Sequence, residues 1–283
     1  MNGPRLLLST GTVYVYPLRA AFALAQASGC DGVELVVGPE LGLRGPGVIR
    51  RLAAEMGVSL RAIHPPLFGF PGWRRPCDVL QRLVALALSL QIPTVVVHPP
   101  RATRLDSPVI TRFQDRLGEA QRRLCGSGST IVLENPGFYG PRDYHYVLSD
   151  LPTLCRFADE VHTGLALDTT HAGDSPYPLL ESYAIIGTRL RHIHLSDTRT
   201  PPRWLGQRLL DTYVKHHQLP GEGFLPLPEF ASALARDGYG GDITLEISPV
   251  SLQMWSFGRA KDRLRQAVHS VQMWWSRGVS TSR

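Results

Sequence analysis

The chain has 283 residues, 43% of them hydrophobic and 19% charged, which excludes intrinsic disorder and is enough for one large buried core. No stretch approaches the roughly eighteen consecutive apolar residues of a membrane span, and the run Leu6–Leu8 is too short for a signal-peptide core. The formal net charge of +6 is carried almost entirely by arginine, which favours anionic ligands, although a compositional habit of the source genome would give the same excess.

Short apolar strands and amphipathic helices alternate from the start of the chain. Proline near the first turn and glycine after the last turn delimit the first helix. In chain order, the pattern predicts a strand over Arg5–Ser9, a helix from about Pro17 to Gly29, a strand over Gly32–Val37, a helix over Val48–Met56, a strand over Val58–His64, a helix over Cys77–Leu90, a strand over Thr94–His98 and a helix over Ser107–Leu124.

The second half of the chain repeats this alternation. It predicts a strand over Thr130–Glu134, a helix over Leu151–Ala158, a strand over Gly164–Asp168, a helix over Pro178–Gly187, a strand over Leu190–Leu195, a helix over Pro228–Arg236, a strand over Asp242–Ile247 and a last helix over Ser256–Trp275. The longest connection, residues 197–227, follows the seventh strand, and a loop of this length in a compact domain is usually functional.

Eight strand–helix units in strict alternation predict an α/β fold with a parallel sheet that closes into a (β/α)8 TIM barrel. No change of composition marks a linker, so we expect a single TIM-barrel domain over residues 1–283. Active sites in this fold lie at the carboxyl ends of the strands. The four cysteines are scattered without a CxxC pair, which is typical of free thiols and predicts a cytoplasmic protein.

Polar side chains fall at the carboxyl ends of the predicted strands. Alternation along the sixth strand turns Leu165 and Leu167 to one face and Asp168 to the other, at the strand's tip. Seven strands finish on a side chain that can bind a metal ion: Glu34, His64, His98, Glu134, Asp168, His194 and Glu246.

Four of these side chains, from strands five to eight, predict a metal site: Glu134, Asp168, His194 and Glu246. Three carboxylates and one imidazole in an inward ring would repel one another unless a cation compensates their charge. An oxygen-rich set of this kind suits Mn²⁺, Mg²⁺ or Co²⁺, and Zn²⁺ becomes favoured as imidazoles are added. His64 and His98 could build a second metal position that shares Glu134.

Other polar residues near the ring have more than one interpretation. His171 and His217 could be further ligands or bind substrate. Glu34 is either a substrate contact or a carboxylate paired with a barrel arginine. His192 shares a strand face with His194 one layer deeper, which favours a structural histidine. Three tryptophans near the C-terminus fit either helix packing or a homo-oligomer contact: Trp255, Trp274 and Trp275.

The polar motifs lie in a recognisable order. They are Gly32–Leu35, Leu133–Asn135, Leu167–His171, His192–Asp197, His217 with Gly221–Gly223, and Thr244–Glu246. In order and strand placement they resemble the xylose isomerase-like TIM barrel superfamily over nearly the whole chain. That superfamily contains sugar and sugar-phosphate isomerases and epimerases, and also endonuclease IV-type abasic-site nucleases.

The resemblance to the ketose epimerases implies a divalent metal held by Glu134, Asp168, His194 and Glu246. The two glutamates there also act as acid and base on opposite faces of the sugar. The same resemblance implies that His171 and Arg199 bind substrate, whereas a further glutamate of that branch would fall on Gly140.

The resemblance to the nucleases covers eight of nine zinc ligands: His64, His98, Glu134, Asp168, His171, His194, His217 and Glu246. The ninth, an aspartate, falls on Lys215, where a cation should disfavour a third metal. Leu67 and Phe68 stand where a tyrosine–leucine wedge is expected.

The favoured hypothesis is a divalent-metal-dependent isomerase or epimerase that acts on a sugar or sugar phosphate through a metal-stabilised enediolate. Glu134 and Glu246 would transfer the protons, and Arg199 and Arg203 would bind a substrate phosphate. One alternative is an abasic-site endonuclease or other metal phosphodiesterase, with nucleic acid as partner. The other is a sugar-binding barrel without catalysis.

Overall fold

The computed structural model describes residues 3–68, 73, 75–200 and 213–280. Within them, parallel strands form a closed barrel in chain order, with the last strand paired to the first. The strands are β1 (Arg5–Ser9), β2 (Gly32–Val36), β3 (Leu60–His64), β4 (Thr94–Val97), β5 (Thr130–Glu134), β6 (Gly164–Asp168), β7 (Leu190–Leu195) and β8 (Asp242–Leu245). The predicted (β/α)8 barrel is confirmed.

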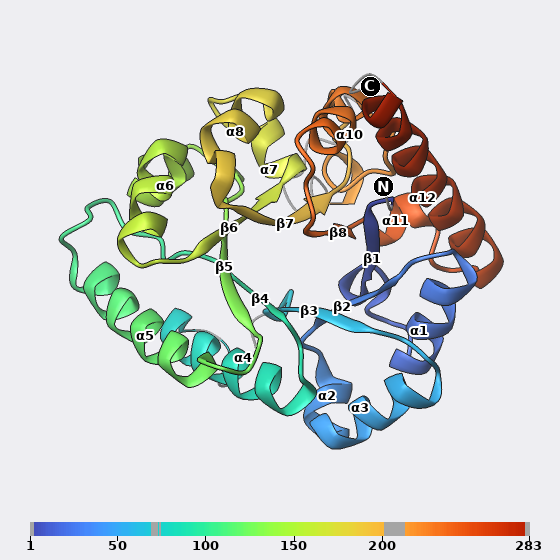
Figure 1. The fold of residues 1–283 in the computed structure, drawn as a ribbon, viewed down its shortest axis with the longest axis horizontal. Coiled ribbons are helices and arrows are strands. Elements are labelled where there is room, and N and C mark those ends of the chain that lie inside the picture. The colour runs from blue at the N-terminus through green and yellow to red at the C-terminus, as the bar shows by residue number, and fades with distance from the viewer. Residues whose placement is uncertain (1–2, 69–72, 74, 201–212, 281–283) are drawn as a thin grey trace.

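Helices surround the ring of strands, as Figure 1 shows. The longer ones are α1 (Leu18–Ala27), α3 (Pro46–Glu55), α4 (Pro76–Leu90), α5 (Pro108–Leu124), α6 (Leu151–Glu160), α8 (Leu179–Ile186), α10 (Leu227–Arg236) and α12 (Phe257–Ser280). Each corresponds to a predicted helix. The last one continues past its predicted end at Trp275.

The main core lies between the strands and the helices, because each strand turns alternate residues outward. Leu165 and Leu167 of β6 belong to this outer core, as the sequence predicts. Ala166, between them, points the other way and packs with Val96 and Val132 inside the barrel. The same alternation carries Asp168 inward at the end of β6.

Short helical segments that the sequence does not predict also lie in the connections between the longer elements. They are α2 (Pro39–Arg44), α7 (Thr169–Gly173), α11 (Pro249–Leu252), and the 3-10 turns η1 (Thr10–Val13), η2 (Asp143–His145), η3 (Val147–Ser149) and η4 (Gly187–Arg189). Segments of this length are too short for a hydrophobic period, so pattern analysis misses them. Side chains at their first residues stabilise two of them: Asp168 caps α7, and Ser248 caps α11.

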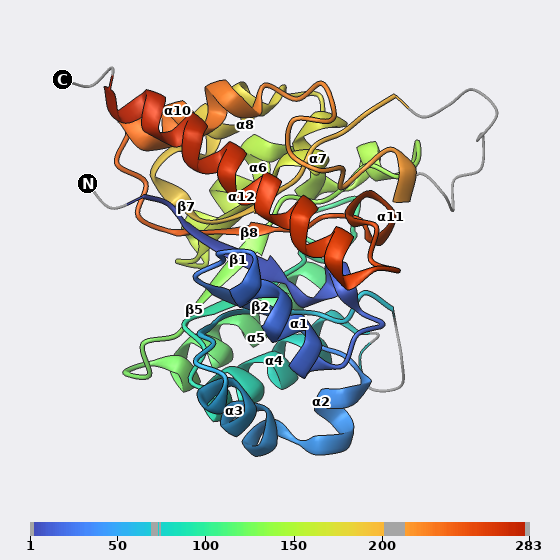
Figure 2. The same ribbon diagram turned by 90° about the vertical axis from the view of Figure 1, so that its right-hand side faces the viewer.

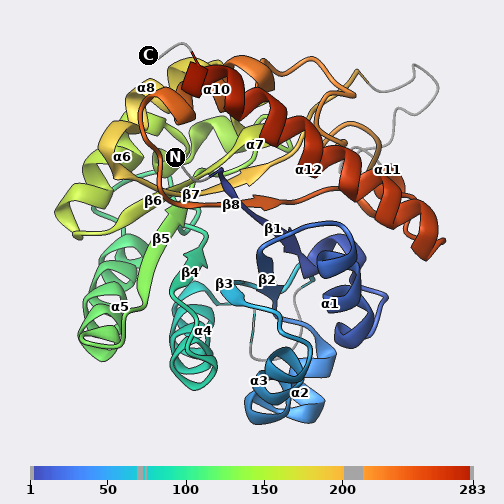
Figure 3. The same cartoon turned by 45° about the vertical axis from the view of Figure 1, so that its right-hand side comes forward.

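The C-terminal helix α12 packs against both α10 and α1, which Figure 2 and Figure 3 show from two sides. Trp274 and Trp275 are buried on this helix, so they serve helix packing. Trp255 precedes the helix and is 66% exposed. No described helix is long and apolar enough to cross a membrane.

Candidate metal centre and active site

A cavity of about 580 Å³ opens at the carboxyl ends of the strands. Six of the predicted site residues line it: His64, His98, Glu134, His171, His217 and Glu246. His98 and Glu246 directly follow β4 and β8, since these strands end one or two residues earlier than predicted. The rest of the wall contains tyrosines that the sequence reading did not single out, namely Tyr14, Tyr139 and Tyr213.

Three residues of the predicted ring offer ligand atoms close together, and the fourth, Glu134, approaches the same histidine. His194 Nδ1 lies 3.1 Å from Glu246 Oε2 and 3.5 Å from Glu134 Oε1. Asp168, His194 and Glu246 each offer a ligand atom, and these atoms lie within 4.8 Å of one another. Side chains at the ends of strands five to eight therefore gather around His194, and two of them, Glu134 and Glu246, line the cavity.

Two atoms of this ring lack hydrogen-bond partners, although both are buried: Asp168 Oδ2 and His194 Nδ1. The other oxygen of Asp168 is fully engaged, because it accepts hydrogen bonds from the backbone N–H of Thr170 (2.7 Å) and of His171 (2.9 Å). Leaving a carboxylate oxygen buried and unpaired is costly unless something positive contacts it. The donor set of the ring thus fits a divalent cation.

Loop residues after β5 hold this geometry. The amide of Asn135 bridges β5 and β6, because its Oδ1 accepts from the Asp168 backbone N–H at 2.6 Å and its Nδ2 donates to the Asp168 carbonyl at 3.2 Å. Gly137 has no room for a side chain, since a Cβ there would lie 2.7 Å from the ring of His171. That ring contacts the Asn135 carbonyl through Nδ1 and the Tyr139 hydroxyl through Nε2.

Glu134 also lies close to two further histidines, His64 and His98. Its Oε2 lies 3.0 Å from His98 Nε2 and 3.5 Å from His64 Nε2, and the two ring nitrogens are 3.2 Å apart. His64 Nδ1 lies 2.8 Å from the Pro65 carbonyl, which assigns the proton to Nδ1 and leaves the lone pair on Nε2. Glu134 Oε2 and the two Nε2 atoms thus lie within 3.5 Å of one another, and a second metal position here stays a prediction.

The charges of the ring shift its pKa values in opposite directions. Burial would raise the pKa of Glu134, but His194 and then His98 outweigh it and hold this pKa well below its usual value. Burial would lower the pKa of His194, but the surrounding carboxylates outweigh it and raise this pKa well above its usual value. Without a cation, the ring at neutral pH thus pairs ionised carboxylates with a protonated imidazole.

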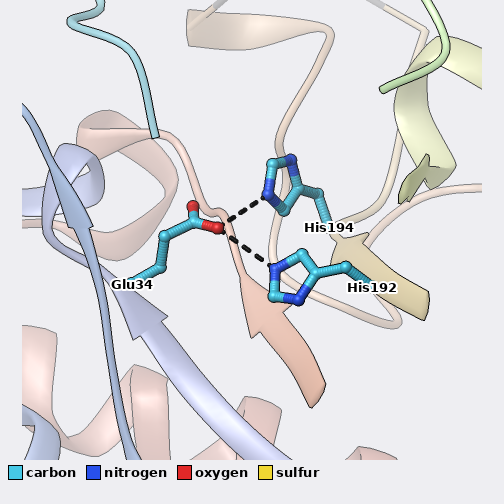
Figure 4. A group of neighbouring side chains, drawn as sticks. All are labelled: Glu34, His192 and His194. Atoms are coloured by element: carbon cyan, nitrogen blue, oxygen red, sulfur yellow. Dashed lines mark hydrogen bonds and ion pairs between the residues drawn. The ribbon is translucent and has the colours of Figure 1, made fainter. Parts of the chain in front are cut away.

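Glu34 does not reach the cavity. Its side chain is fully buried, and its Oε2 lies 2.9 Å from His194 Nε2 and 3.1 Å from His192 Nε2 (Figure 4). This position disagrees with the expected substrate contact, because the imidazole of His194 separates Glu34 from the cavity-lining carboxylates Glu134 and Glu246. The alternative expectation of an arginine partner is also wrong, since the partners are histidines.

The comparison with protein families decides the classification. The model of the xylose isomerase-like TIM barrel family matches residues 22–274. The chain belongs to this family.

The chain also resembles curated proteins over most of its length. The uncharacterized protein Rv0498 of Mycobacterium tuberculosis is 28% identical over 291 residues, which cover 95% of this chain and 96% of that protein. The fructoselysine 3-epimerase of Shigella flexneri is 23% identical over 259 residues, which cover 82% of this chain and 85% of that enzyme. The chain thus resembles a sugar epimerase over most of its length.

Solved structures share the barrel. D-psicose 3-epimerase from Clostridium cellulolyticum H10, with D-tagatose, superposes with a TM-score of 0.68 at 15% identity over 94% of this chain and 97% of that one. An AP endonuclease of family 2 from Brucella melitensis superposes with a TM-score of 0.68 at 19% identity over 94% and 98%. At these identities the likeness shows the fold alone, and one fold can host different chemistries.

The cationic residues expected at the site lie elsewhere or outside the described ranges. Arg199 donates from Nε to the Val214 carbonyl at 2.7 Å and is not among the residues that line the cavity. Arg203 lies outside the described residues. Lys215 forms an ion pair of 2.7 Å with Asp174, which also contacts His216 at 2.5 Å. The charge of Lys215 is therefore compensated by Asp174.

Proposed function

We propose that this protein is a divalent-metal-dependent sugar isomerase or epimerase that moves a proton through an enediolate of the substrate. The observation that carries the proposal is the ring around His194 Nδ1, where Glu246 and Glu134 approach at 3.1 and 3.5 Å beside an open cavity. Two carboxylates at one point are what proton removal and return require. Membership of a family with sugar epimerases among its relatives supports the same chemistry.

The cation would be held by four side chains: Glu134, Asp168, His194 and Glu246. Bound there, it would supply positive charge that stabilises the negative charge developing on a substrate oxygen. Three carboxylates and one imidazole favour Mn²⁺, Mg²⁺ or Co²⁺, and the nearby His64 and His98 favour Zn²⁺ if a second position fills. The unpartnered Asp168 Oδ2 and His194 Nδ1 support this assignment.

Glu134 and Glu246 would act as the base and the acid. Burial would raise the pKa of each, but neighbouring histidines lower it, so both carboxylates are ionised at neutral pH and able to accept a proton. One, in its ionised form, would remove the proton next to the substrate carbonyl, and the other, after taking up a proton from water in the cavity, would deliver it to the opposite face or to the neighbouring carbon. His171 and His217, which line the cavity, would bind substrate hydroxyls.

The substrate we propose is an uncharged sugar. Among the described residues that line the cavity there is no lysine or arginine to pair with a phosphate. The wall instead presents tyrosine rings and hydroxyls, which suit the mixed polar and apolar faces of a sugar. Sugar phosphates remain part of the test, because Arg203 lies outside the described residues.

Proton exchange tests the proposal directly. Protein loaded in turn with Mn²⁺, Mg²⁺, Co²⁺ and Zn²⁺ would be incubated in D2O with ketoses, their glycosides and their phosphates, and deuterium at carbon would be followed by NMR. We expect exchange that depends on the metal and on an unphosphorylated sugar. Sugar binding without any exchange would contradict the proposal and indicate a sugar-binding barrel.

A second candidate is an abasic-site endonuclease, which one observation favours. Six of the eight residues that resemble nuclease zinc ligands line the cavity, and the other two, Asp168 and His194, each form a possible metal-binding group with residues of that lining. A duplex with one abasic site, incubated with Zn²⁺-loaded protein and an EDTA control, separates the two activities. We expect no nicking, and chelator-sensitive nicking at the lesion would establish the nuclease instead.

Metal affinity should rise with pH. In the metal-free protein the pKa of His194 is raised above its ordinary value of 6.5, and a metal ligand must lose this proton. Below this raised pKa, each unit by which the pH falls should therefore weaken Mn²⁺ binding about tenfold, while above it the affinity levels off. Calorimetric titrations between about pH 5 and pH 8 measure this dependence. If the Mn²⁺ affinity did not change over that range, His194 would not be a metal ligand.

A further inference from the structure

A buried carboxylate lies directly beneath the proposed metal ligand His194. Glu34 comes from β2, and His194 and His192 come from β7, on the far side of the barrel interior. All three side chains are fully buried. Figure 4 shows both imidazole rings pointing at the same carboxylate oxygen, Glu34 Oε2.

The hydrogen bonds fix where the ring protons lie. An ionised carboxylate only accepts, so the Nε2 atoms of His194 at 2.9 Å and of His192 at 3.1 Å both donate to Glu34 Oε2. The opposite tautomer of His194 would place a lone pair against that oxygen in a buried site. With the proton on Nε2, neutral His194 keeps its free lone pair on Nδ1.

His194 Nδ1, the nitrogen that keeps the free lone pair, faces the carboxylates of Glu246 and Glu134. His194 Nδ1 is buried without a hydrogen-bond partner, 3.1 Å from Glu246 Oε2. Glu34 therefore contacts Nε2 of the His194 imidazole, while the carboxylates of Glu246 and Glu134 lie near Nδ1. Histidines that bind metals commonly donate their second N–H to a carboxylate, which sets the tautomer and strengthens the ligand.

A role in packing alone does not account for Glu34. Its Oε1 is buried without a hydrogen-bond partner, and in the described part of the chain its ion-pair partners are the two histidines. Burying such a group is unfavourable compared with an apolar side chain of the same size. A requirement for a hydrogen-bond acceptor at this point explains why a carboxylate is present.

We infer that Glu34 is a positioning residue of the metal centre, which holds His194 in the tautomer that directs the Nδ1 lone pair at the cation. His192 and Thr244 keep the carboxylate oxygen in place, since His192 Nε2 contacts both Glu34 Oε2 and, at 3.0 Å, Thr244 Oγ1. The inference rests on the proposed metal centre and not on the sugar chemistry.

Calorimetric titration with Mn²⁺ tests this role in three variants. Glu34→Ala should weaken Mn²⁺ binding by roughly 10–100-fold, because His194 loses the acceptor that orients it. Glu34→Gln should weaken it less, since the amide oxygen can still accept from both Nε2 atoms. Asp242→Asn is the matched control, because Asp242 is also a buried barrel carboxylate but pairs with Arg5 and Arg61 at the start of β8. It should lower thermal stability and leave the Mn²⁺ affinity unchanged.

Nitrogen NMR of histidine-labelled, Zn²⁺-loaded wild-type protein gives a second readout that a packing role would not produce. We expect the proton of His194 on Nε2, and a proton on Nδ1 instead would overturn the inference even if Glu34→Ala does not fold. Unchanged Mn²⁺ affinity in folded Glu34→Ala would also overturn it. Weakened affinity in that variant, with no sugar turnover by the wild type, would support the role of Glu34 and count against the proposed reaction. Wild-type protein that binds no Mn²⁺ would overturn both.

Discussion

Glu246→Gln should reduce metal-dependent proton exchange on the sugar by roughly 10²–10⁴-fold, the usual contribution of a general acid or base. Glutamine keeps an oxygen that can face the cation, but it cannot take up or release a proton at neutral pH. The Glu246 carboxylate follows β8 at the edge of the cavity, 3.1 Å from His194 Nδ1. Turnover and Mn²⁺ affinity should be measured on the same preparation, so that loss of catalysis is separated from loss of metal.

Glu222→Gln is the matched control for this change. Glu222 lies outside the cavity lining and pairs with Arg263 at 2.6 Å on the surface. It should retain wild-type exchange, because only a surface ion pair is lost. Full exchange activity in Glu246→Gln would remove Glu246 from the proton-transfer assignment. Exchange lost together with Mn²⁺ binding would restrict its role to that of a ligand.

Asp168→Asn should weaken metal binding by roughly 100-fold or more, since even a lost supporting group costs up to about 100-fold, while it leaves the metal-free fold intact. One oxygen of Asp168 caps α7 by accepting from the backbone N–H groups of Thr170 and His171. An asparagine oxygen can take over this cap, since asparagine and aspartate cap helices about equally well. The amide NH2 would then replace the unpartnered Oδ2 and present hydrogens, not a lone pair, to the cation.

Two further variants check this separation of roles. Asp168→Ala should lose the metal and also about 1 kcal/mol of stability from the missing cap. Asp150→Asn makes the same chemical change at the N-terminus of α6, where Asp150 caps the helix through Thr153, and it should bind Mn²⁺ as the wild type does. Thermal unfolding without metal and Mn²⁺ titration measure the two effects. Wild-type Mn²⁺ affinity in Asp168→Asn would exclude Asp168 as a ligand.

Some of the site follows from local sequence, and some of it does not. Alternation along a strand is local, so it placed Asp168 and Glu134 inward from the sequence alone. The partners of Glu34 could not be predicted in this way, since His192 and His194 lie about 160 positions away along the chain and reach it across the barrel. Arg199 and Lys215 likewise contact groups that no local pattern indicates, namely the Val214 carbonyl and the Asp174 carboxylate.

The sequence by itself determined the barrel and the residues that finish its strands, because the periods of strands and helices and their alternation are properties of neighbouring residues. Only the tertiary structure decided which atoms of the ring lack partners and which carboxylate contacts His194 on its other side. These depend on the register between strands, on short capped helices such as α7, and on contacts across the interior of the barrel. Such contacts join residues far apart in the chain and leave no local pattern in the sequence.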